Sequence, residues 1–517
     1  MLGFLYYAWT YIQATSFVID GTRYYVLFDD AMISMRYAYN LAHGNGLVWN
    51  VGERVQGFTN PLWVFYMAGL HLLPIPAPQV ALAVQLTGAA LLAAALLVVR
   101  RIVEHLTHDL LAMLGAVAFT AFYAPLLSYG LLGMEVSALA LLLAASILLV
   151  LRNGTDRFTP WLYVMLAVGT LLRSDMAVPY VIIVAAMCLI QRQHRTKHLA
   201  WGLGLLVLSL GGQGLASFIY YSQWLPNTYY LKVEGWPFTL RILRGLYALV
   251  WFIYYSNWML FVLPLTLLLF RRDWQVLLPF AILFGQLAYS VYVGGDAWEH
   301  HGGANRYICI AMPLFFALLA VSVEELRRRA TALLGDTRFG ELGSRLVWAA
   351  SFVVALLNFN LLMGDWKSIE RWDLARRPDY VAGSDANLSA ALALRHTTTP
   401  DATIAVLGAG TIPYLLPDHR VLDILGKTDP VIAHEAVRTP MSIEDVPDMR
   451  PGHMKWDYAR TFGELKPDVI VSIWPGTTEE AAPYLKDYVI GEIAPHIRVY
   501  LRRGSPNILW DQITIAG

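Results

Sequence analysis

The stretch Phe28-Asp29-Asp30-Ala31-Met32-Ile33-Ser34-Met35-Arg36-Tyr37 places two adjacent carboxylates directly after the first apolar run of the chain. A carboxylate at a membrane surface is costly unless something uses it. Asp29 and Asp30 are therefore the first candidates for chemistry. A helix N-cap is the competing interpretation, since aspartate favours that position. Consecutive side chains point in different directions, so one of the two can cap a helix while the other reacts.

The composition is that of a membrane protein. Of the 517 residues, 57% are hydrophobic and 15% are charged, whereas soluble proteins carry about 25% charged residues. The net charge of zero gives no reason to expect nucleic acid as a partner. Cys188 and Cys309 lie in apolar segments, and neither a disulfide framework nor a metal motif is visible. The N-terminal segment lacks a basic region and a cleavage site, so we expect an uncleaved first transmembrane helix.

Apolar runs long enough to cross the hydrocarbon core, about 20 residues, recur along the first two thirds of the chain. They lie near residues 2–20, 79–99, 110–128, 136–151, 199–221, 246–270, 274–293, 306–323 and 344–363. Arg173-Ser174-Asp175 interrupts the apolar region 160–191, which we interpret as two short helices meeting at the outer face. The total is about eleven spans. Residues 59–73 are short and end in Pro74, which fits a helix lying in the membrane interface.

Basic residues predict the orientation. They cluster at one set of helix ends, namely Arg100-Arg101, Arg152, Arg192, Arg195, Lys197, Arg271-Arg272 and Arg327-Arg328-Arg329. The positive-inside rule assigns these ends, and the N-terminus, to the cytoplasm. An odd number of spans then puts the Asp29-Asp30 loop and the tail after Gly364 on the extracytoplasmic side. The expected localisation is the inner (plasma) membrane, with a periplasmic tail.

The tail, residues 365–517, is charged and contains no run long enough to span a membrane. Thr403–Gly408 and Asp468–Ile473 are typical of buried strands, and 385–396 is typical of a helix. The expected fold class is thus a polytopic α-helical membrane protein with a soluble C-terminal α/β domain. Its domains are 1–364, with interfacial helices in the first outer loop at about 28–73, and 365–517. Gly408-Ala409-Gly410 lacks the third glycine of a dinucleotide fingerprint and fits a tight strand-exit turn better.

Polar groups gather in the predicted outer loops. Residues 30–42 predict an amphipathic helix, with Met32, Met35, Tyr39 and Ala42 on one side. Further loops carry Glu135, Arg173 with Asp175, and the segments 224–232 and 294–307. A transfer from a lipid-linked sugar needs a carboxylate that accepts a proton or stabilises the anomeric carbon, and cations that hold the departing phosphate. Candidate cations are Arg173, Lys232, Arg306, His300 and His301; candidate rings beside a sugar or a polyprenyl chain are Trp224, Tyr229, Tyr230 and Trp298.

Each candidate has a structural alternative. Tyrosine and tryptophan are enriched at membrane interfaces as anchors. Arg173 and Asp175 could form only a pair that caps two short helices. Adjacent histidines such as His300 and His301 rarely bind one ion, and no third ligand is evident. A divalent metal is therefore possible but not indicated.

The first-loop run from Asp29 to Ala38, with His43–Asn50 and Gly57–Trp63, resembles the GT-C class of polytopic glycosyltransferases. It is most similar to the terminal β-(1→2)-arabinofuranosyltransferases that finish cell-wall arabinan. Further blocks that look like this group are Trp224–Tyr230, Gly294–Asp296, Asp423–Pro430 and Pro451–Lys455. These matches are scattered over almost the whole chain.

The resemblance implies a polyprenyl-phosphate sugar donor, Asp29 or Asp30 as the catalytic carboxylate, and a periplasmic domain that helps to bind the acceptor. The resemblance and the polar residues of the predicted outer loops together give one set of residues that we expect to contact the sugar donor or the glycan acceptor. The set is Arg36, Asn60, Glu135, Arg173, Asp175, Asn227, Tyr229, Tyr230, Lys232, Asp296, His300, His301, Arg306, Lys427, Asp429, His453 and Lys455. Two segments depart from the family pattern: Ser174-Asp175-Met176, where relatives often have Pro-Glu-Gly, and Glu299-His300-His301, which replaces a shorter sequence.

The expected function is transfer of a sugar, D-arabinofuranose by preference, from polyprenyl phosphate to an extracytoplasmic glycan. The first-loop signature is widespread among bacterial glycosyltransferases, so another sugar, or an acceptor such as O-antigen or pilin, is the alternative. A transporter or flippase would place ionisable groups near the bilayer midplane, and a non-catalytic scaffold would not explain the clustered loop chemistry. Expected partners are the lipid-linked donor, the glycan and membrane lipid; no cofactor beyond the donor is expected.

Overall fold

The computed structural model describes residues 1–255, 258–299, 303–334, 340, 342–346, 348–351, 370, 372–438 and 442–515. These residues form two compact units. Unit 1 contains residues 1–14, 85–213 and 241–379, and unit 2 contains residues 15–84, 214–240 and 380–517. The loop at about 28–73, which was predicted to be the first outer loop, therefore belongs to the same compact unit as the tail. The predicted boundary at residue 364, between a transmembrane and a periplasmic domain, stays a prediction.

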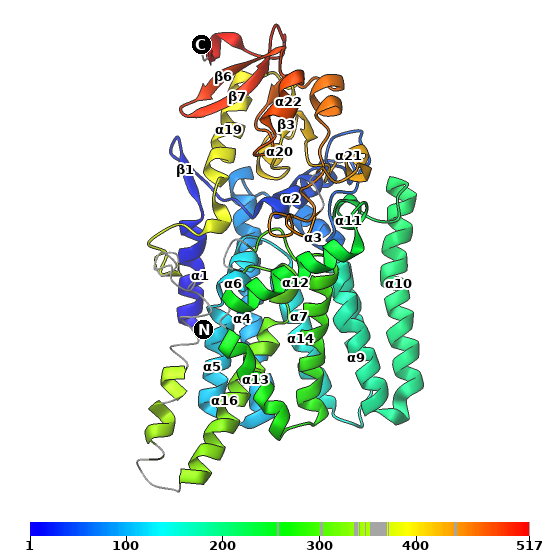
Figure 1. The fold of residues 1–517 in the computed structure, drawn as a ribbon, viewed down its shortest axis with the longest axis vertical. Coiled ribbons are helices and arrows are strands. Elements are labelled where there is room, and N and C mark those ends of the chain that lie inside the picture. The colour runs from blue at the N-terminus through cyan, green and yellow to red at the C-terminus, as the bar shows by residue number, and fades with distance from the viewer. Residues whose placement is uncertain are drawn as a thin grey trace. The chain divides into compact units, whose positions relative to one another are not determined.

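Unit 1 is helical (Figure 1). Its longer helices are α1 (Leu2–Ala14), α4 (Val80–Thr107), α5 (Leu110–Ala121), α6 (Ala124–Leu131), α7 (Val136–Asn153), α8 (Trp161–Leu172), α9 (Ala177–Ile190), α10 (Arg195–Tyr221), α12 (Phe238–Tyr255), α13 (Trp258–Phe270), α14 (Trp274–Tyr292) and α16 (Met312–Leu334). The division into units cuts α4, α10 and α12 near one end. The short helix α15 (Arg306–Cys309) lies between α14 and α16 in sequence.

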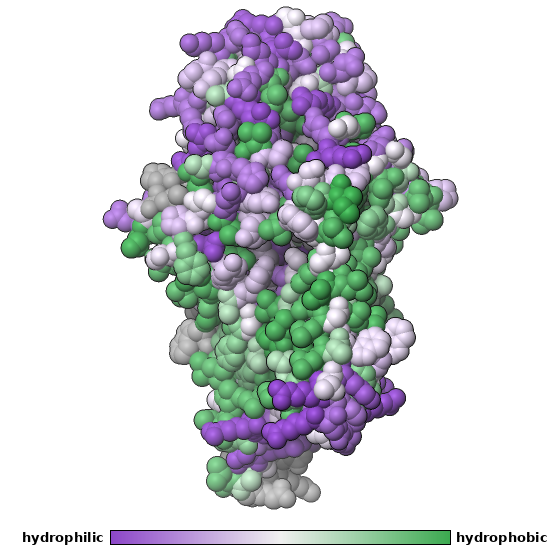
Figure 2. Space-filling view, turned by 90° about the vertical axis from the view of Figure 1, so that its right-hand side faces the viewer, coloured by the Kyte–Doolittle hydropathy of each residue, from purple (hydrophilic) through white to green (hydrophobic). Residues whose placement is uncertain are grey.

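The described residues contain four helices that are long and apolar enough to cross a membrane: Ala77–Thr107, Val136–Asn153, Arg192–Tyr221 and Trp274–Tyr292. Counting each of two bent helix pairs as one span raises the number to six. Leucine, valine and tryptophan side chains of α10, among them Trp201 and Val207, are exposed. Figure 2 shows hydrophobic residues covering much of the helical surface, with a hydrophilic band beside them. The protein is thus a multi-pass membrane protein; the total of about eleven spans stays a prediction, and most of 344–363 lies outside the described residues.

Several helix boundaries differ from the prediction. The first helix ends at Ala14, and a hairpin of β1 (Phe17–Ile19) and β2 (Thr22–Tyr24) follows where the apolar run to residue 20 predicted helix. Asp20 and Gly21 both have positive φ (50° and 76°), as a tight hairpin turn requires. The predicted span 110–128 is divided into α5 and α6, bent by 54°. Pro125 near the start of α6 explains this break, since proline disfavours a continuous helix across the preceding residue. The break at Arg173 between α8 and α9 is confirmed.

Unit 2 combines the first outer loop, the segment around α11 (Asn227–Val233) and the tail. The loop forms α2 (Asp29–Ala42) and α3 (Pro61–His71), which pack together, in agreement with the predicted helices. The tail contains a six-stranded sheet in the order β4-β3-β5-β7-β6-β8. Its strands are β3 (Thr403–Val406), β4 (Arg420–Asp423), β5 (Val469–Ile470), β6 (Tyr488–Ala494), β7 (Ile497–Arg502) and β8 (Thr514–Ile515).

The three strands β4, β3 and β5 are parallel, and the remaining neighbours are antiparallel. Helix α19 (Ser384–Thr397) packs on β6 and β7 and on α20 (Thr411–Leu415) (Figure 1). The α/β prediction for the tail is therefore correct in class. Parallel strands present the loops after their carboxyl ends at one edge of the sheet, and the loops after β3 and β4 carry the residues described next.

Candidate functional site

Asp29 begins α2, and its carboxylate contacts the tail. Phe28 occupies the N-cap position, so neither aspartate caps the helix. The Oδ1 atom of Asp29 accepts hydrogen bonds from the backbone N–H and the hydroxyl of Thr411, at 2.9 and 3.2 Å. Burial raises the pKa of Asp29, the hydrogen bonds from Thr411 and the charge of Lys427 oppose the rise, and Asp30 adds to it. No described residue donates a hydrogen bond to its other oxygen, Oδ2.

Glycines of the loop after β3 permit this contact. A Cβ built at Gly410 would collide with the backbone carbonyl of Asp29, so only glycine fits that position. A Cβ built at Gly408 would lie 3.4 Å from Asp29 Oδ2 and 3.7 Å from Asn387 Nδ2, both ordinary contact distances. The segment Gly408-Ala409-Gly410 is thus the strand-exit turn that was predicted, and it positions a carboxylate.

Asp30 pairs with a lysine of the tail. The ammonium group of Lys427 donates to Asp30 Oδ1 at 2.8 Å, and the two side chains are 12% and 16% exposed. Burial alone would lower the pKa of Lys427, but Asp30, and also Asp29 and Asp423, raise it. The lysine therefore stays charged, and it holds positive charge among three carboxylates.

The turn that carries Lys427 is built on Asp423, the last residue of β4. Asp423 accepts hydrogen bonds from the backbone N–H groups of Leu425 and Thr428, at 3.0 and 2.9 Å. Burial raises the pKa of Asp423 to about 6. Because both of its oxygens hold backbone N–H groups, this carboxylate shapes the turn from 423 to 428.

His453 and Lys232 lie next to the ion pair of Asp30 and Lys427. Burial lowers the pKa of His453 to about 3, with Lys427 and Lys232 acting in the same direction and Asp30 opposing them. A Cβ built at Gly452 would lie 3.3 Å from Lys232 Cε, which places the lysine of α11 against the chain just before His453. Unit 2 therefore gathers two carboxylates, two lysines and one neutral histidine from three separate segments.

Arg36 has a structural environment. It is 1% exposed, and its guanidinium donates to the backbone carbonyls of Trp49, Pro413, Leu416 and His419 and to the side chain of Asn50. It also lies over the ring of Trp49, 4.9 Å from the centroid. These contacts join α2 to the tail and favour a structural role over substrate contact.

Three further expected contact residues are also engaged within unit 2. Lys455 is fully buried and donates to the carbonyls of Tyr230 and Ala433, at 3.2 and 2.9 Å. Asp429 caps α21 (Pro430–His434) through Val431 N–H and pairs with Arg460 at 3.1 Å. Asn60 accepts a hydrogen bond from Ser34 at 3.0 Å, at the start of α3. These hydrogen bonds and the ion pair give Lys455, Asp429 and Asn60 structural roles within unit 2.

Helix α11 carries the remaining expected residues of unit 2. Tyr229 is 41% exposed, and Tyr230 packs on His434 with ring centroids 4.2 Å apart. The backbone N–H of Asn227 donates to Gln56 at 2.9 Å, and its side-chain amide donates to Gly426 at 3.3 Å. Asn227 therefore touches the residue that precedes Lys427.

Unit 1 contains a second polar cluster, in which all the groups are buried. Arg173 forms a bidentate ion pair with Asp175, with N–O distances of 2.6 and 2.9 Å, and donates a hydrogen bond to Glu135 at 3.0 Å. Arg306 forms the same kind of pair with Asp296, at 2.9 and 3.0 Å, and its carbonyl accepts from Arg173 at 3.3 Å. The predicted loops at 135, 173–175 and 296–306 thus converge. Breaking one partner of such a buried pair leaves an uncompensated charge.

Arg244 and Glu299 extend this cluster. Their side chains pair at 2.7 Å and are nearly buried. Burial raises the pKa of Glu299 to about 7, although Arg244 opposes the rise. His300 and His301 lie outside the described residues.

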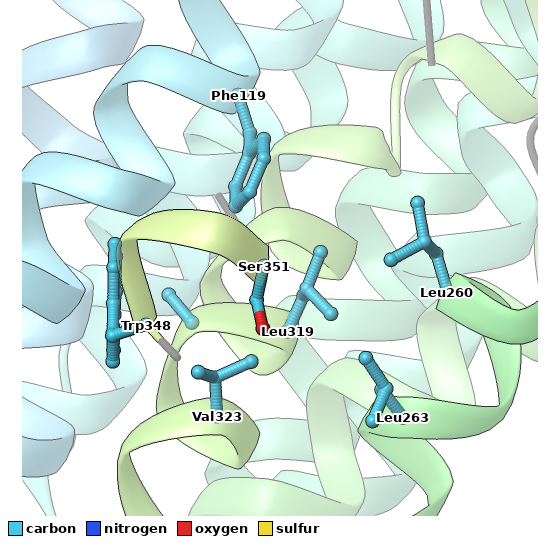
Figure 3. Close-up of a pocket in the computed structure, with 8 residues that line it drawn as sticks. Phe119, Leu260, Leu263, Leu319, Val323, Trp348 and Ser351 are labelled. Atoms are coloured by element: carbon cyan, nitrogen blue, oxygen red, sulfur yellow. The ribbon is translucent and has the colours of Figure 1, made fainter. Parts of the chain in front are cut away.

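An apolar pocket in unit 1 offers little for chemistry (Figure 3). It is lined by Phe119, Leu260, Leu263, Leu319, Ala320, Val323, Trp348 and Ser351. The hydroxyl of Ser351 and the indole N–H of Trp348 are the polar side-chain groups of these residues. Across the described ranges, no group of three or more His, Cys, Asp or Glu side chains is placed to hold a metal ion.

Three positioning residues were not among the sequence candidates: Thr411, Asp423 and Arg244. Asp423 is the last residue of β4 and Thr411 follows β3, and side chains at the ends of parallel strands often meet ligands. A strand assignment for 420–423 would have pointed to Asp423, and the predicted strand at 403–408 was the available signal for Thr411. Arg244 lies with Arg241 in the otherwise apolar helix α12, and an arginine in such a pattern could have been flagged as a buried partner.

Comparison with known proteins supports the fold. The model of a domain of unknown function (DUF8728) matches residues 373–505, within the tail. No curated protein matches the chain. Crystal structures of ArnT from Cupriavidus metallidurans superimpose with TM-scores of 0.53 in the apo state and 0.57 with undecaprenyl phosphate bound, each at 14% identity and covering 97% of both chains. The apo oligosaccharyltransferase from Archaeoglobus fulgidus has a TM-score of 0.52 at 11% identity, covering 99% of this chain and 75% of its own. Both are GT-C glycosyltransferases, and the likeness shows that this chain shares their fold.

Proposed function

We propose that the protein is a membrane glycosyltransferase that moves a sugar, D-arabinofuranose by preference, from a polyprenyl-phosphate donor to an extracytoplasmic glycan. The observation that carries the proposal is the group formed by Asp29, Asp30 and Lys427, where the first outer loop meets the tail. The structural neighbour crystallised with undecaprenyl phosphate supports a lipid-linked donor. The resemblance of the first loop to arabinofuranosyltransferases supports the sugar.

Asp29 is the proposed general base. Thr411 orients its carboxylate through Oδ1, and Oδ2 carries no hydrogen bond from a described residue. A base acts best when its pKa lies near the operating pH, and burial shifts Asp29 in that direction. In the proposed step the acceptor hydroxyl oxygen forms a bond to the anomeric carbon while the bond to the phosphate oxygen breaks. Asp29 takes the hydroxyl proton, and polyprenyl phosphate leaves with the electron pair.

Lys427 and Lys232 are the proposed partners of the departing phosphate. Negative charge builds on that group as the bond breaks, and cations fixed in advance stabilise it. Asp30 pairs with Lys427 at 2.8 Å and holds the ammonium group in position. The two arginine pairs of unit 1 are proposed to hold the loops that carry them in place.

The proposed location is the plasma membrane, with a cytoplasmic N-terminus and an extracytoplasmic tail. The apolar helices support membrane insertion, and the positive-inside rule supports the orientation. Accessibility labelling of single cysteines in the tail, in intact cells, tests this directly: labelling by an impermeant reagent is expected, and labelling only after lysis would contradict the orientation.

A transfer assay tests the function. Purified protein with decaprenyl-phosphoryl-arabinose and an arabinan oligosaccharide should yield a product lengthened by one arabinose. Polyprenyl-phosphate donors of other sugars should react at least tenfold more slowly. Activity only with another sugar would contradict the arabinose assignment, and absence of transfer from every polyprenyl-phosphate donor would contradict the proposed function.

The pH dependence of this reaction should report Asp29. A base must be unprotonated, and the raised pKa of Asp29 means that its protonated form persists to higher pH than the ordinary value of about 4. We expect kcat/KM to fall as the pH decreases, with the midpoint of the fall above that of an ordinary aspartate. The measurement is a pH–rate profile with saturating donor.

Asp423 is the competing source of such a profile, since its pKa is also raised, to about 6. His453, with a pKa of about 3, stays neutral over the same range. The variant Asp423→Asn is the control: the acidic fall should persist in it. A fall that disappears in Asp423→Asn would contradict the assignment to Asp29.

A further inference from the structure

Two consecutive side chains at the start of α11 carry buried polar atoms that no described residue satisfies. Asn227 is 0% exposed, and its carbonyl oxygen Oδ1 has no hydrogen-bond partner among the described residues. The hydroxyl oxygen of Thr228 is also buried, and it has no partner in the same described part of the chain. A buried acceptor left unpaired costs about 1–3 kcal/mol. Folded proteins pair such groups with water or with a ligand.

These two residues lie beside the proposed catalytic group. The side-chain amide of Asn227 donates to the carbonyl of Gly426 at 3.3 Å, and the next residue, Lys427, pairs with Asp30 at 2.8 Å. The backbone N–H of Asn227 donates to Gln56 at 2.9 Å. The following residue, Gly57, lies so close that a Cβ built there would be 2.8 Å from the carbonyl of Lys427. Residues 56–57, 227 and 426–428 thus form one contiguous group of segments.

The chemistry of the two unpaired groups defines what they can bind. The amide oxygen of Asn227 only accepts hydrogen bonds, whereas the hydroxyl of Thr228 both donates and accepts. The oxygens of an ionised phosphate also only accept hydrogen bonds, so a phosphate cannot satisfy the amide oxygen of Asn227. A neutral hydroxyl, which donates one hydrogen bond and accepts others, complements both, and a sugar offers several hydroxyls on adjacent carbons.

We propose that Asn227 and Thr228 bind a hydroxyl of the substrate sugar and help to select that sugar. This inference rests on the proposed function and deepens it by naming residues that read the substrate. The hydroxyl comes either from the donor sugar or from the acceptor glycan. A site that hydrogen-bonds a hydroxyl discriminates strongly against an analogue that lacks it, because the buried polar groups are then left unpaired.

The test compares Thr228→Val and Thr228→Ser with the wild-type protein in the arabinose transfer assay. Valine matches the shape of threonine and removes only the hydroxyl. We expect Thr228→Val to lower kcat/KM about tenfold, the value of one hydrogen bond, and Thr228→Ser to stay within about twofold. The Tm of Thr228→Val should be unchanged or slightly raised, because the variant loses an unpaired polar group. Thr461→Val is the matched control: its hydroxyl is also buried without a described partner, and it should keep wild-type activity.

Two substrate series identify the source of the hydroxyl, one of mono-deoxy donors and one of mono-deoxy acceptors. In one series, a single deoxy analogue should lower kcat/KM of the wild-type protein about tenfold. With that analogue, Thr228→Val should be as active as the wild-type protein, because the hydrogen bond is already lost. The inference would be overturned if Thr228→Val had the kcat/KM of the wild-type protein. It would also be overturned if the variant were less active than the wild-type protein by the same factor with every analogue. Inactivity of the wild-type protein with all polyprenyl-phosphate donors would instead refute the proposed function.

Discussion

Replacing Asp29 with asparagine should lower kcat/KM for sugar transfer by about 100-fold or more, the contribution expected of a general base. Asparagine keeps an acceptor oxygen for the hydrogen bond from the backbone of Thr411, which the native carboxylate receives at 2.9 Å. The fold should therefore survive while the proton acceptor is lost. The measurement is kcat/KM with the polyprenyl-phosphate donor, together with Tm. The residual activity of Asp29→Asn should also lack the acidic fall in its pH profile.

Asp30→Asn is the matched comparison, since it changes the neighbouring residue in the same way. Asp30 holds Lys427 at 2.8 Å, so its loss should release the lysine and raise the cost of phosphate departure. We expect about a tenfold decrease, the effect of losing one charged hydrogen bond, with the acidic fall retained. A larger loss in Asp30→Asn than in Asp29→Asn would assign the base to Asp30. Full activity in the double variant would reject both carboxylates.

Arg36→Leu should destabilise unit 2 by about 3–5 kcal/mol, which is in the range of exceptional single substitutions. The guanidinium is 1% exposed and satisfies the carbonyls of Trp49 and His419, among others, at 2.6 and 2.9 Å. Leucine would leave these buried carbonyls unpaired, at a cost of about 1–3 kcal/mol each before relaxation. Thermal unfolding in detergent should show a lower Tm, and transfer should fall with it because α2 carries Asp29.

Arg420→Ala provides the control for this prediction. Arg420 also joins the tail to the first loop, through an ion pair with Glu53 at 2.8 Å, but both side chains are exposed, at 47% and 38%. An exposed pair contributes about 0–1 kcal/mol, so Tm should hardly change. Equal losses of Tm in Arg36→Leu and Arg420→Ala would contradict the structural role of Arg36. Arg36→Lys should fall between them, because lysine lacks the planar fork of donors.

Local signals in the sequence predicted most of the helices and the class of the tail. Apolar runs predicted α4, α7, α10 and α14 closely, and the charged break at Arg173 predicted the separation of α8 from α9. The hairpin at Phe17–Tyr24 was missed because its first strand, Phe17–Ile19, is apolar and continues the first helical run. The Asp20-Gly21 step between the two strands was the available signal, since this dipeptide favours a hairpin turn.

The sequence named some residues of the candidate site but gave no sign of their contacts. Asp29, Lys427 and His453 were named from separate segments, and nothing in their spacing shows that the tail meets the first loop. The roles of Arg36 and Lys455 were equally hidden, because a basic residue in a loop has the same sequence signature whether it contacts a substrate or buried carbonyls. Those carbonyls, such as that of Pro413 for Arg36, belong to distant turns whose position depends on tertiary packing.

A structure of the protein with a non-reactive polyprenyl-phosphate donor analogue bound tests the central claim most directly. The account predicts that the anomeric carbon lies beside Asp29, with room for an acceptor hydroxyl at Oδ2, and that Lys427 contacts the phosphate. An analogue bound with its anomeric carbon far from both Asp29 and Asp30 would contradict the account.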